Sequence, residues 1–150
     1  EPLPEGFTRM EASASLLEVL AQSDAVVVSC QLTKETQNIM NAAAFAAMRP
    51  GGIVVNVARG EIVDEDALLD ALDRGHLKGA VLDVYAGETS GPPPERLWRH
   101  PKVLITPHNS PRVVGMPTGP GLGISIFCEN LKAYLDGKEM KNVVDWTRGY

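Results

Sequence analysis

Residues 51–64 read Gly-Gly-Ile-Val-Val-Asn-Val-Ala-Arg-Gly-Glu-Ile-Val-Asp, and the rest of the chain is arranged around them. The centre, Ile53 to Val57, is a short β-branched run after a glycine pair, which predicts a strand buried on both faces. Arg59 follows the strand, and Asp64 opens the next helix. This order of strand, charged turn and helix is typical of an open parallel sheet, in which ligands bind outside the carboxyl ends of the strands.

The composition indicates one domain whose partners are small molecules or proteins. The 150 residues include 14 Lys and Arg against 19 Asp and Glu, which argues against nucleic acid or a membrane surface as a partner. The apolar runs are too short for a transmembrane helix. Cys30 and Cys128 lack a metal-type spacing, so no metal site is predicted. No secretory leader is found at Glu1, which favours a reducing, cytoplasmic setting.

Strands and helices are expected to alternate along the chain. Further strands are predicted at Ala25 to Ser29, where the strand is expected to be buried, at Ala80 to Tyr85 and at Val103 to Thr106, with a short edge strand at Phe7 to Met10. Their spacing leaves room for one helix between strands, and right-handed crossovers then bring the carboxyl ends of the strands to one rim. We therefore predict an α/β fold with a Rossmann-type parallel sheet and flanking helices.

Capping residues mark the expected helix ends. Ser15, Asn41 and Asp64 each precede an apolar helical pattern and are predicted to cap it. Gly75 supplies a left-handed terminus for the third of these helices. A C-terminal helix is predicted at about 120–136, followed by an ordered tail whose apolar side chains are covered. Leu97 and Trp98 are expected to enter the core.

The rim loops carry Gln31, Arg59, Asp83 with Glu88, and His108. A cation, a carboxylate and an imidazole on one rim can bind and protonate an oxyanionic substrate. Arg59 offers a planar fork that matches a carboxylate, and His108 can exchange a proton with a substrate oxygen while Glu88 fixes its orientation. Asp83 interrupts an apolar strand, so it is expected to meet a backbone donor or a ligand amide.

Structural alternatives stand beside these assignments. Arg59 could instead pair with Glu61 or Asp64 on the surface. His108 could cap the turn that follows its strand, and Glu88 could be a solvated carboxylate in a Gly/Pro loop.

Three other features are interpreted as unconnected with catalysis. His76 and His100 are expected to be solvated. The glycines between Gly119 and Gly123 resemble a phosphate loop only superficially, because they do not directly follow a strand and Pro120 removes an amide.

Several of these residues, in this order, resemble the D-2-hydroxyacid dehydrogenase family, NAD(P)-dependent enzymes related to phosphoglycerate, glyoxylate/hydroxypyruvate and formate dehydrogenases. The resemblance runs from about Ser15 to the end of the chain. The segments that carry it are Ser-Asp-Ala-Val-Val-Val-Ser-Cys-Gln-Leu-Thr at 23–33, Met48 to Asp64, Leu-Asp-Val-Tyr at 82–85 with Glu88, Leu97-Trp98, and Thr-Pro-His at 106–108.

The resemblance implies that Arg59 binds the substrate carboxylate and polarises the keto oxygen, and that His108 is the general acid/base with Glu88 as its partner. Hydride would pass between C2 of a small 2-hydroxyacid or 2-ketoacid and the nicotinamide of NAD or NADP, with NAD favoured. The residues implied to line the dinucleotide are Cys30, Gln31, Val57, Ala58, Arg59, Asp83 and His108, with Asp83 near the carboxamide.

The chain also departs from the family pattern. Gln31 and Thr89 stand where the family usually has Pro, and Asn109-Ser110-Pro111 replaces apolar and small residues after the histidine. The family's Gly-rich loop, its ribose-reading acid and most of its substrate domain would lie upstream of Glu1.

Residues 1–150 are therefore expected to form a partial dinucleotide-binding domain that lacks the first strand–loop–helix unit. Alone, the chain is expected to bind NAD weakly or not at all and to turn over nothing. The full-length protein is expected to be a homodimer. Two alternatives remain: a dinucleotide-sensing binding protein of the corepressor type, and an α/β domain that pairs with another chain.

Overall fold

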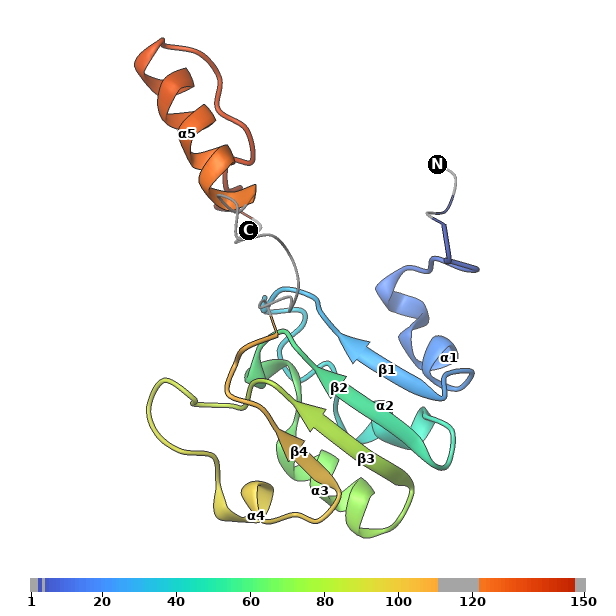
Figure 1. Cartoon of the computed structure of the whole chain (residues 1–150). Helices are drawn as coiled ribbons and strands as arrows, with labels where there is room; N and C mark the ends of the chain where they lie inside the picture. Colours follow the sequence, from blue (N-terminus) through green and yellow to red (C-terminus); the bar gives the residue numbers. More distant parts are fainter. Residues whose placement is uncertain (1–2, 4, 111–121, 148–150) are drawn as a thin grey trace. The chain divides into compact units, whose positions relative to one another are not determined.

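A computed structural model describes residues 3, 5–110 and 122–147, and the chain divides into two compact units, Glu1–Ser110 and Pro111–Tyr150. The first unit contains a four-stranded, all-parallel sheet in the order β1-β2-β3-β4 (Figure 1). Its strands are β1 (Ala25–Val28), β2 (Gly52–Asn56), β3 (Leu77–Leu82) and β4 (Val103–Ile105). The predicted Rossmann-type parallel sheet is confirmed.

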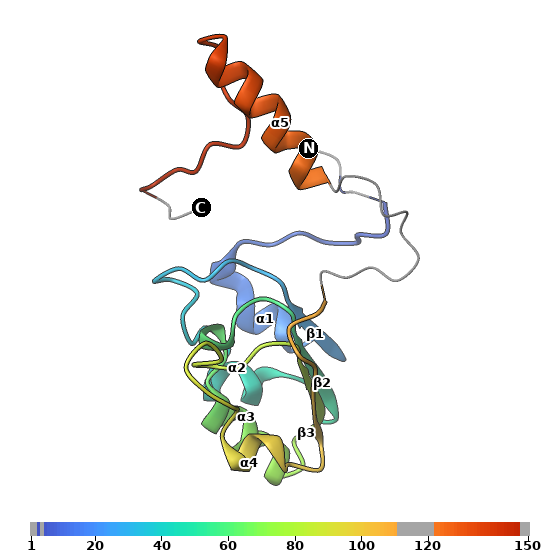
Figure 2. The same cartoon turned by 60° about the vertical axis from the view of Figure 1, so that its left-hand side comes forward.

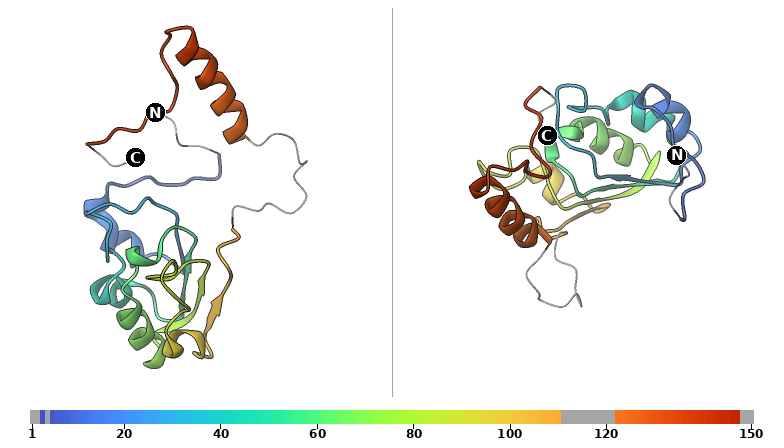
Figure 3. Two further views of the ribbon diagram at one scale, coloured as in Figure 1. Left: turned by 90° about the vertical axis from the view of Figure 1, so that its left-hand side faces the viewer. Right: turned by 90° about the horizontal axis from the view of Figure 1, so that it is seen from above.

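Short helices precede β1 and fill the connections between the strands. They are η1 (Ser13–Ser15), α1 (Leu16–Leu20), α2 (Ala42–Ala47), η2 (Gly60–Ile62), α3 (Glu65–Asp73) and α4 (Glu95–Trp98). Each strand lies next to its successor, and α1 to α4 all lie on the same face of the sheet (Figures 2 and 3). The connections therefore all return on one side, as right-handed crossovers in a single direction require.

Side-chain caps determine where two of these helices begin. The Asn41 carboxamide accepts hydrogen bonds from two N–H groups of the first turn of α2, at 3.0 and 3.1 Å, and Asp64 accepts one from α3 at 3.0 Å. Gly75 ends α3 with φ +73°, as predicted. The predicted cap at Ser15 is wrong: its side chain makes no capping bond, because the chain enters α1 through the turn of η1.

The core lies between the sheet and these helices. Its fully buried members include Leu20, Phe45, Met48, Val54, Ile62, Leu68, Leu72, Leu77, Leu82 and Leu97. Leu97 enters the core as predicted, but Trp98 is 63% exposed, because adjacent residues of the short helix α4 point to different sides.

The opposite face of the sheet carries an apolar row that no helix of residues 5–110 covers. Val27 pairs with Val55, Val55 with Val81, and Val81 with Leu104. Val27 is 62% and Leu104 59% exposed. The predictions that β1 is buried and that β2 is buried on both faces are therefore wrong: burial alternates along β2, because helices pack on one side only.

Two predicted strands also need correction. Phe7 to Met10 forms no strand, and none of its residues pairs with the four-stranded sheet. The strand predicted at Ala80 to Tyr85 begins earlier, at Leu77, and ends at Leu82. It begins earlier because Leu77 pairs with Gly52 at the start of β2, and Leu82, which pairs with Asn56 and Ile105, is its last residue paired with the neighbouring strands.

The described part of the second unit is α5 (Leu122–Leu135) with the chain that follows it. The helix matches the prediction, and Gly137 follows it with φ +67°. The Asn130 carboxamide bonds both the N–H and the C=O of Lys141, at 2.8 and 2.7 Å, so the chain folds back along the helix. Beyond this contact the predicted covering of the tail is wrong, because Trp146 is 88% exposed.

Two predicted features lie outside the described residues: the glycine-containing loop before Leu122 and the last tail residue, Tyr150. None of the helices in residues 5–110 and 122–147 has both the length and the apolar character needed to cross a membrane.

Candidate active site

The carboxyl ends of all four strands lie at one edge of the sheet, where the arrowheads of Figure 1 point. The loops that leave this edge carry every residue predicted for the site: Cys30 and Gln31 after β1, Val57, Ala58 and Arg59 after β2, Asp83 and Glu88 after β3, and His108 after β4. The parallel topology therefore gathers residues that are as far apart as 78 positions in sequence (108 − 30).

His108 and Glu88 are in direct contact. Nδ1 of His108 lies 2.9 Å from Oε1 of Glu88, and the two side chains are 41% and 22% exposed. A carboxylate at Nδ1 favours the tautomer that carries its proton there, which leaves Nε2 as the nitrogen that can exchange a proton with a ligand. Both side chains line a shallow hollow of about 370 Å³, together with Tyr85, Thr89, Thr106 and Pro107.

A buried amide fixes the turn that carries Arg59. Asn56 is fully buried at the end of β2; its Nδ2 donates to the Arg59 carbonyl at 2.9 Å, and its Oδ1 accepts from the Ala58 N–H at 3.0 Å. The Arg59 guanidinium is exposed and donates to the Ala58 carbonyl at 2.6 Å. Among the described residues it forms no ion pair, so the surface pairing with Glu61 or Asp64 does not occur there.

Gly60 brings the loop after β2 into backbone contact with the loop after β3. A Cβ atom on Gly60 would lie 2.0 Å from the Tyr85 carbonyl carbon and 2.2 Å from the Ala86 nitrogen, so no other residue fits here. Glu65, in the first turn of α3, accepts the Ala86 N–H at 2.7 Å. Burial raises the pKa of the Glu65 carboxyl above its ordinary value, and this hydrogen bond opposes the effect. The Arg59 turn thus lies beside Tyr85, which lines the hollow.

Asp83 lies below the rim, and its carboxylate is occupied by the chain itself. Asp83 accepts hydrogen bonds from the Thr106 hydroxyl, from the Asn109 N–H at 3.0 Å and from the Ser110 N–H at 2.7 Å. Burial alone would raise the pKa of this carboxyl, but these hydrogen bonds outweigh it and hold the pKa well below its usual range. The predicted backbone donor is therefore present, and the group is ionised.

The other residues predicted to line a dinucleotide are spread along the same rim. Cys30 and Gln31 are exposed, and the Gln31 carbonyl accepts the Thr36 hydroxyl at 2.7 Å. Val57 is partly exposed, whereas Ala58 is buried, and its N–H and C=O are bonded by Asn56 and Arg59. No hydrogen bond or ion pair joins Arg59 to His108 or Glu88 within residues 5–110. His108 and Glu88 therefore contact each other directly, whereas the Arg59 guanidinium lies on the neighbouring loop.

Both histidines outside the rim were expected to be solvated; this is wrong for His100, which is buried, whereas His76 is half-buried. His100 is buried, and its Nε2 lies 3.1 Å from Oδ1 of Asp73; this contact, with Arg96, lowers the pKa of the Asp73 carboxyl. Nε2 of His76 lies 3.0 Å from the Met48 carbonyl. Both partners are distant in sequence, so the neighbours of each histidine gave no sign of them.

Asn56, Gly60 and Thr106 support the site without having been assigned a part in it from the sequence. Asn56 could have been found, because an amide within the apolar run from Ile53 to Val57 needs a buried partner. Gly60 and Thr106 have their partners in the loop after β3, and no local pattern reveals such contacts.

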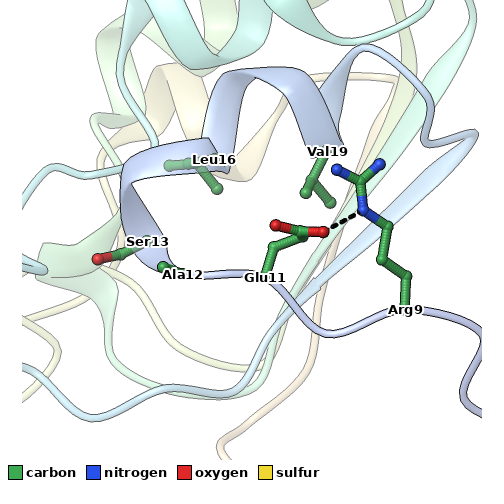
Figure 4. A pocket seen from close by; sticks show the side chains of 6 residues that line it. All are labelled: Arg9, Glu11, Ala12, Ser13, Leu16 and Val19. Atoms are coloured by element: carbon green, nitrogen blue, oxygen red, sulfur yellow. Dashed lines mark hydrogen bonds and ion pairs between the residues drawn. The ribbon is translucent and has the colours of Figure 1, made fainter.

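A second hollow, of about 220 Å³, lies beside α1 and is lined by Arg9, Glu11, Ala12, Ser13, Leu16 and Val19 (Figure 4). Arg9 bonds Glu11 within it, so its cation is already neutralised by the chain. None of the predicted site residues lines this hollow.

Comparison with known proteins agrees with the geometry of the rim. Residues 4–110 match the family described as "D-isomer specific 2-hydroxyacid dehydrogenase, NAD binding domain". Glyoxylate/hydroxypyruvate reductase A of Serratia proteamaculans is 39% identical over 118 residues, which are 79% of this chain and 36% of that protein. D-3-phosphoglycerate dehydrogenase of Bacillus subtilis is 44% identical over 96 residues, which are 64% of this chain and 18% of that protein.

Solved structures give the same result. An NADPH-dependent glyoxylate/hydroxypyruvate reductase of Sinorhizobium meliloti, in complex with NADP and sulfate, matches with a TM-score of 0.82 and 30% identity over 100% of this chain and 47% of that one. A D-isomer specific 2-hydroxyacid dehydrogenase of Xanthobacter autotrophicus Py2, in complex with NADPH and MES, matches with a TM-score of 0.77 and 38% identity over 91% and 54%. The chain spans about half of each of these structures. It belongs to the D-isomer specific 2-hydroxyacid dehydrogenase family, and residues 4–110 correspond to the NAD-binding domain of that family.

Proposed function

We propose that the full-length protein is an NAD(P)-dependent oxidoreductase that interconverts a small 2-ketoacid and its D-2-hydroxyacid. The observation that carries this proposal is the contact of 2.9 Å between His108 and Glu88, on the same rim as the Arg59 turn. A histidine oriented by a carboxylate is the usual form of a general acid/base. A guanidinium on the adjoining loop is suited to the substrate carboxylate.

In the proposed reaction Arg59 binds the carboxylate and polarises the keto oxygen, and Nε2 of His108 donates the proton that this oxygen takes up. Glu88 stabilises the charged imidazole and holds it in place. When bound, the cofactor supplies the hydride. In the reverse direction His108 accepts the hydroxyl proton.

The residues at the rim fit a nicotinamide dinucleotide. Cys30, Gln31, Val57 and Ala58 lie at the carboxyl ends of β1 and β2, where open α/β sheets bind such ligands, and we propose that they line it together with Arg59 and His108. The solved relatives described above contain NADP or NADPH, whereas our prediction favoured NAD. The ratio of kcat/KM for NADH and NADPH in the full-length protein decides between them.

We further propose that residues 1–150 are the carboxyl-terminal part of a dinucleotide-binding domain. The open apolar face of the sheet supports this, because parallel sheets are normally covered on both faces. Exposed apolar side chains on α5, among them Phe127 and Tyr134, support the proposal of a homodimer. The two cysteines, both free thiols, support the proposal of a cytoplasmic setting.

The test is steady-state reduction of glyoxylate, hydroxypyruvate and pyruvate by the full-length protein. We expect turnover with at least one of them, and a loss on the order of 10²- to 10⁴-fold in kcat for His108→Gln, as for removal of a general acid. Cofactor affinity should fall far less than kcat in that variant, because His108 is only one of the residues proposed to line the dinucleotide. His76→Gln is the matched control, because His76 lies away from the rim and should leave kcat unchanged. Dinucleotide binding without turnover of any ketoacid would instead favour a sensing protein.

A further inference from the structure

The buried carboxylate of Asp83 accepts hydrogen bonds from residues on both sides of His108. Its Oδ1 accepts from the Thr106 hydroxyl and from the Asn109 N–H, and its Oδ2 accepts from the Ser110 N–H. All three donors lie within two residues of His108. Because Asp83 is only 3% exposed, water does not compete for these bonds.

His108 itself has an unusual backbone conformation. Its φ is +48°, in the left-handed region that residues with a Cβ atom rarely adopt, and its N–H closes a tight turn on the Thr106 carbonyl at 3.0 Å. Such a conformation persists only where the surroundings impose it. In this conformation Nδ1 reaches Glu88.

We propose that Asp83 is a positioning residue, which holds the His108 backbone in the conformation that directs the imidazole to Glu88 and into the hollow. It acts through the amides of Asn109 and Ser110 and through the Thr106 hydroxyl, and has no need to touch substrate or cofactor. The consequence for turnover rests on the function proposed above, whereas the restraint on His108 does not.

The chemistry of the contact requires a carboxylate. Three donors converge on two oxygens, and a carboxylate offers only acceptors. In Asp83→Asn one of those acceptors becomes an NH₂ group that faces a backbone N–H. Two donors then face each other, and the hydrogen bond to Asn109 or to Ser110 is lost. Thr106→Val keeps the shape and removes one donor, and Thr106→Ser restores that donor.

This proposal differs from direct contact between Asp83 and the cofactor carboxamide, as the family resemblance implies. A residue that binds the cofactor should, when replaced, weaken cofactor affinity. A residue that positions His108 should lower kcat and change the environment of the imidazole while cofactor affinity stays the same. The two readings therefore predict opposite results in one set of measurements.

The experiment compares Asp83→Asn, Thr106→Val and Thr106→Ser with the wild type in the full-length protein. We expect Asp83→Asn to lower kcat on the order of 10²-fold, as misplacement of a catalytic group does, while the Kd for NADH and NADPH changes by less than about twofold. Thr106→Val should lower kcat by less, and Thr106→Ser should recover it. Asp73→Asn, which disrupts the other His–Asp pair, is the control and should leave kcat unchanged.

Histidine ring NMR signals give a readout that does not depend on activity. The His108 signals, assigned with His108→Gln, should move in Asp83→Asn and in Thr106→Val toward their position in Glu88→Gln. If they stay in place, or if Asp83→Asn weakens cofactor binding tenfold with kcat retained, the proposal is overturned. If no ketoacid is turned over at all, the proposed function fails and the NMR shifts still decide the restraint. If Asp83→Asn does not fold, the two Thr106 variants decide it.

Discussion

Asn56 shows how one side chain can shape a binding loop that it does not itself line. Its amide is fully buried and satisfies the N–H of Ala58 and the C=O of Arg59, so the turn is fixed before any ligand arrives. An aliphatic residue, as elsewhere in β2, would pack there but would leave the Ala58 N–H unpaired and the Arg59 C=O with only the Ile62 N–H. The amide therefore serves the turn rather than the core.

Replacing Asn56 by Ala should both destabilise the protein and loosen the Arg59 turn. A buried polar group left without its partner costs about 1–3 kcal/mol, so we expect a loss of that order in the free energy of unfolding, measured by urea titration. Because the guanidinium is proposed to bind the substrate carboxylate, the KM for the ketoacid should rise in the full-length protein.

The control is Asn41→Ala, which removes the cap of α2 and should cost about 1 kcal/mol without changing KM. An unchanged KM in Asn56→Ala, despite a similar loss of stability, would show that the amide supports the fold alone.

Strands β3 and β4 are joined at their carboxyl ends by more than the sheet ladder. Leu82 accepts the Thr106 N–H at 2.9 Å, and one residue further on the Asp83 carboxylate binds the chain that follows β4. Because hydrogen bonds hold the pKa of Asp83 well below its ordinary value, the folded state favours the ionised carboxylate. The contact is therefore sensitive to acid.

The sign of this effect gives a pH prediction. The folded-state pKa is depressed, so the stabilisation by Asp83 is fully present above the unfolded pKa of about 3.9 and is lost as pH falls from there toward the lower folded value. The free energy of unfolding of the wild type should therefore exceed that of Asp83→Asn by a constant amount above about pH 5.

Below about pH 4 the difference should shrink, because the wild-type carboxyl then takes up a proton on unfolding. Denaturant titrations at a series of pH values measure it. A difference that stays constant to pH 3 would mean that Asp83 is not the acid-sensitive group.

How far the sequence could predict these elements depended on where their partners lie. The caps Asn41 and Asp64 were predicted, because a cap bonds residues two or three positions away. The contact of Glu88 with His108 followed from parallel topology, which brings strand ends together. The burial of His100 was not predicted, because its partner Asp73 lies 27 positions earlier on another helix.

In the first unit, helices cover only one face of the sheet. Helices α1 to α4 cover one side, and the row from Val27 to Leu104 crosses the other. Sequence alone could not reveal this, because β-branched runs such as those of β1 and β2 are typical of strands covered on both sides. Whether a second layer is present depends on chain that residues 5–110 do not contain.

Lysine on the uncovered face of the sheet should have different effects in the 150-residue chain and in the full-length protein. In the 150-residue chain, Val27→Lys with Leu104→Lys should reduce binding of an apolar dye and concentration-dependent scattering, with a change in stability within about 0.5 kcal/mol. In the full-length protein the same pair should destabilise by several kcal/mol, because two charges would be buried under the second layer.

Thermal unfolding of both proteins makes the comparison. Equal tolerance in the two would contradict the proposal that residues 1–150 are part of a larger dinucleotide-binding domain.

At Gly60, finally, a single hydrogen atom separates the chain after β2 from the chain after β3. Two backbones this close cannot slide past each other, so a displacement of either loop displaces the other. In the proposed enzyme, a substrate that draws the guanidinium inward would also move the wall of the hollow at Tyr85. Binding of the substrate carboxylate by Arg59 would then be coupled to movement of the hollow around the reacting carbonyl.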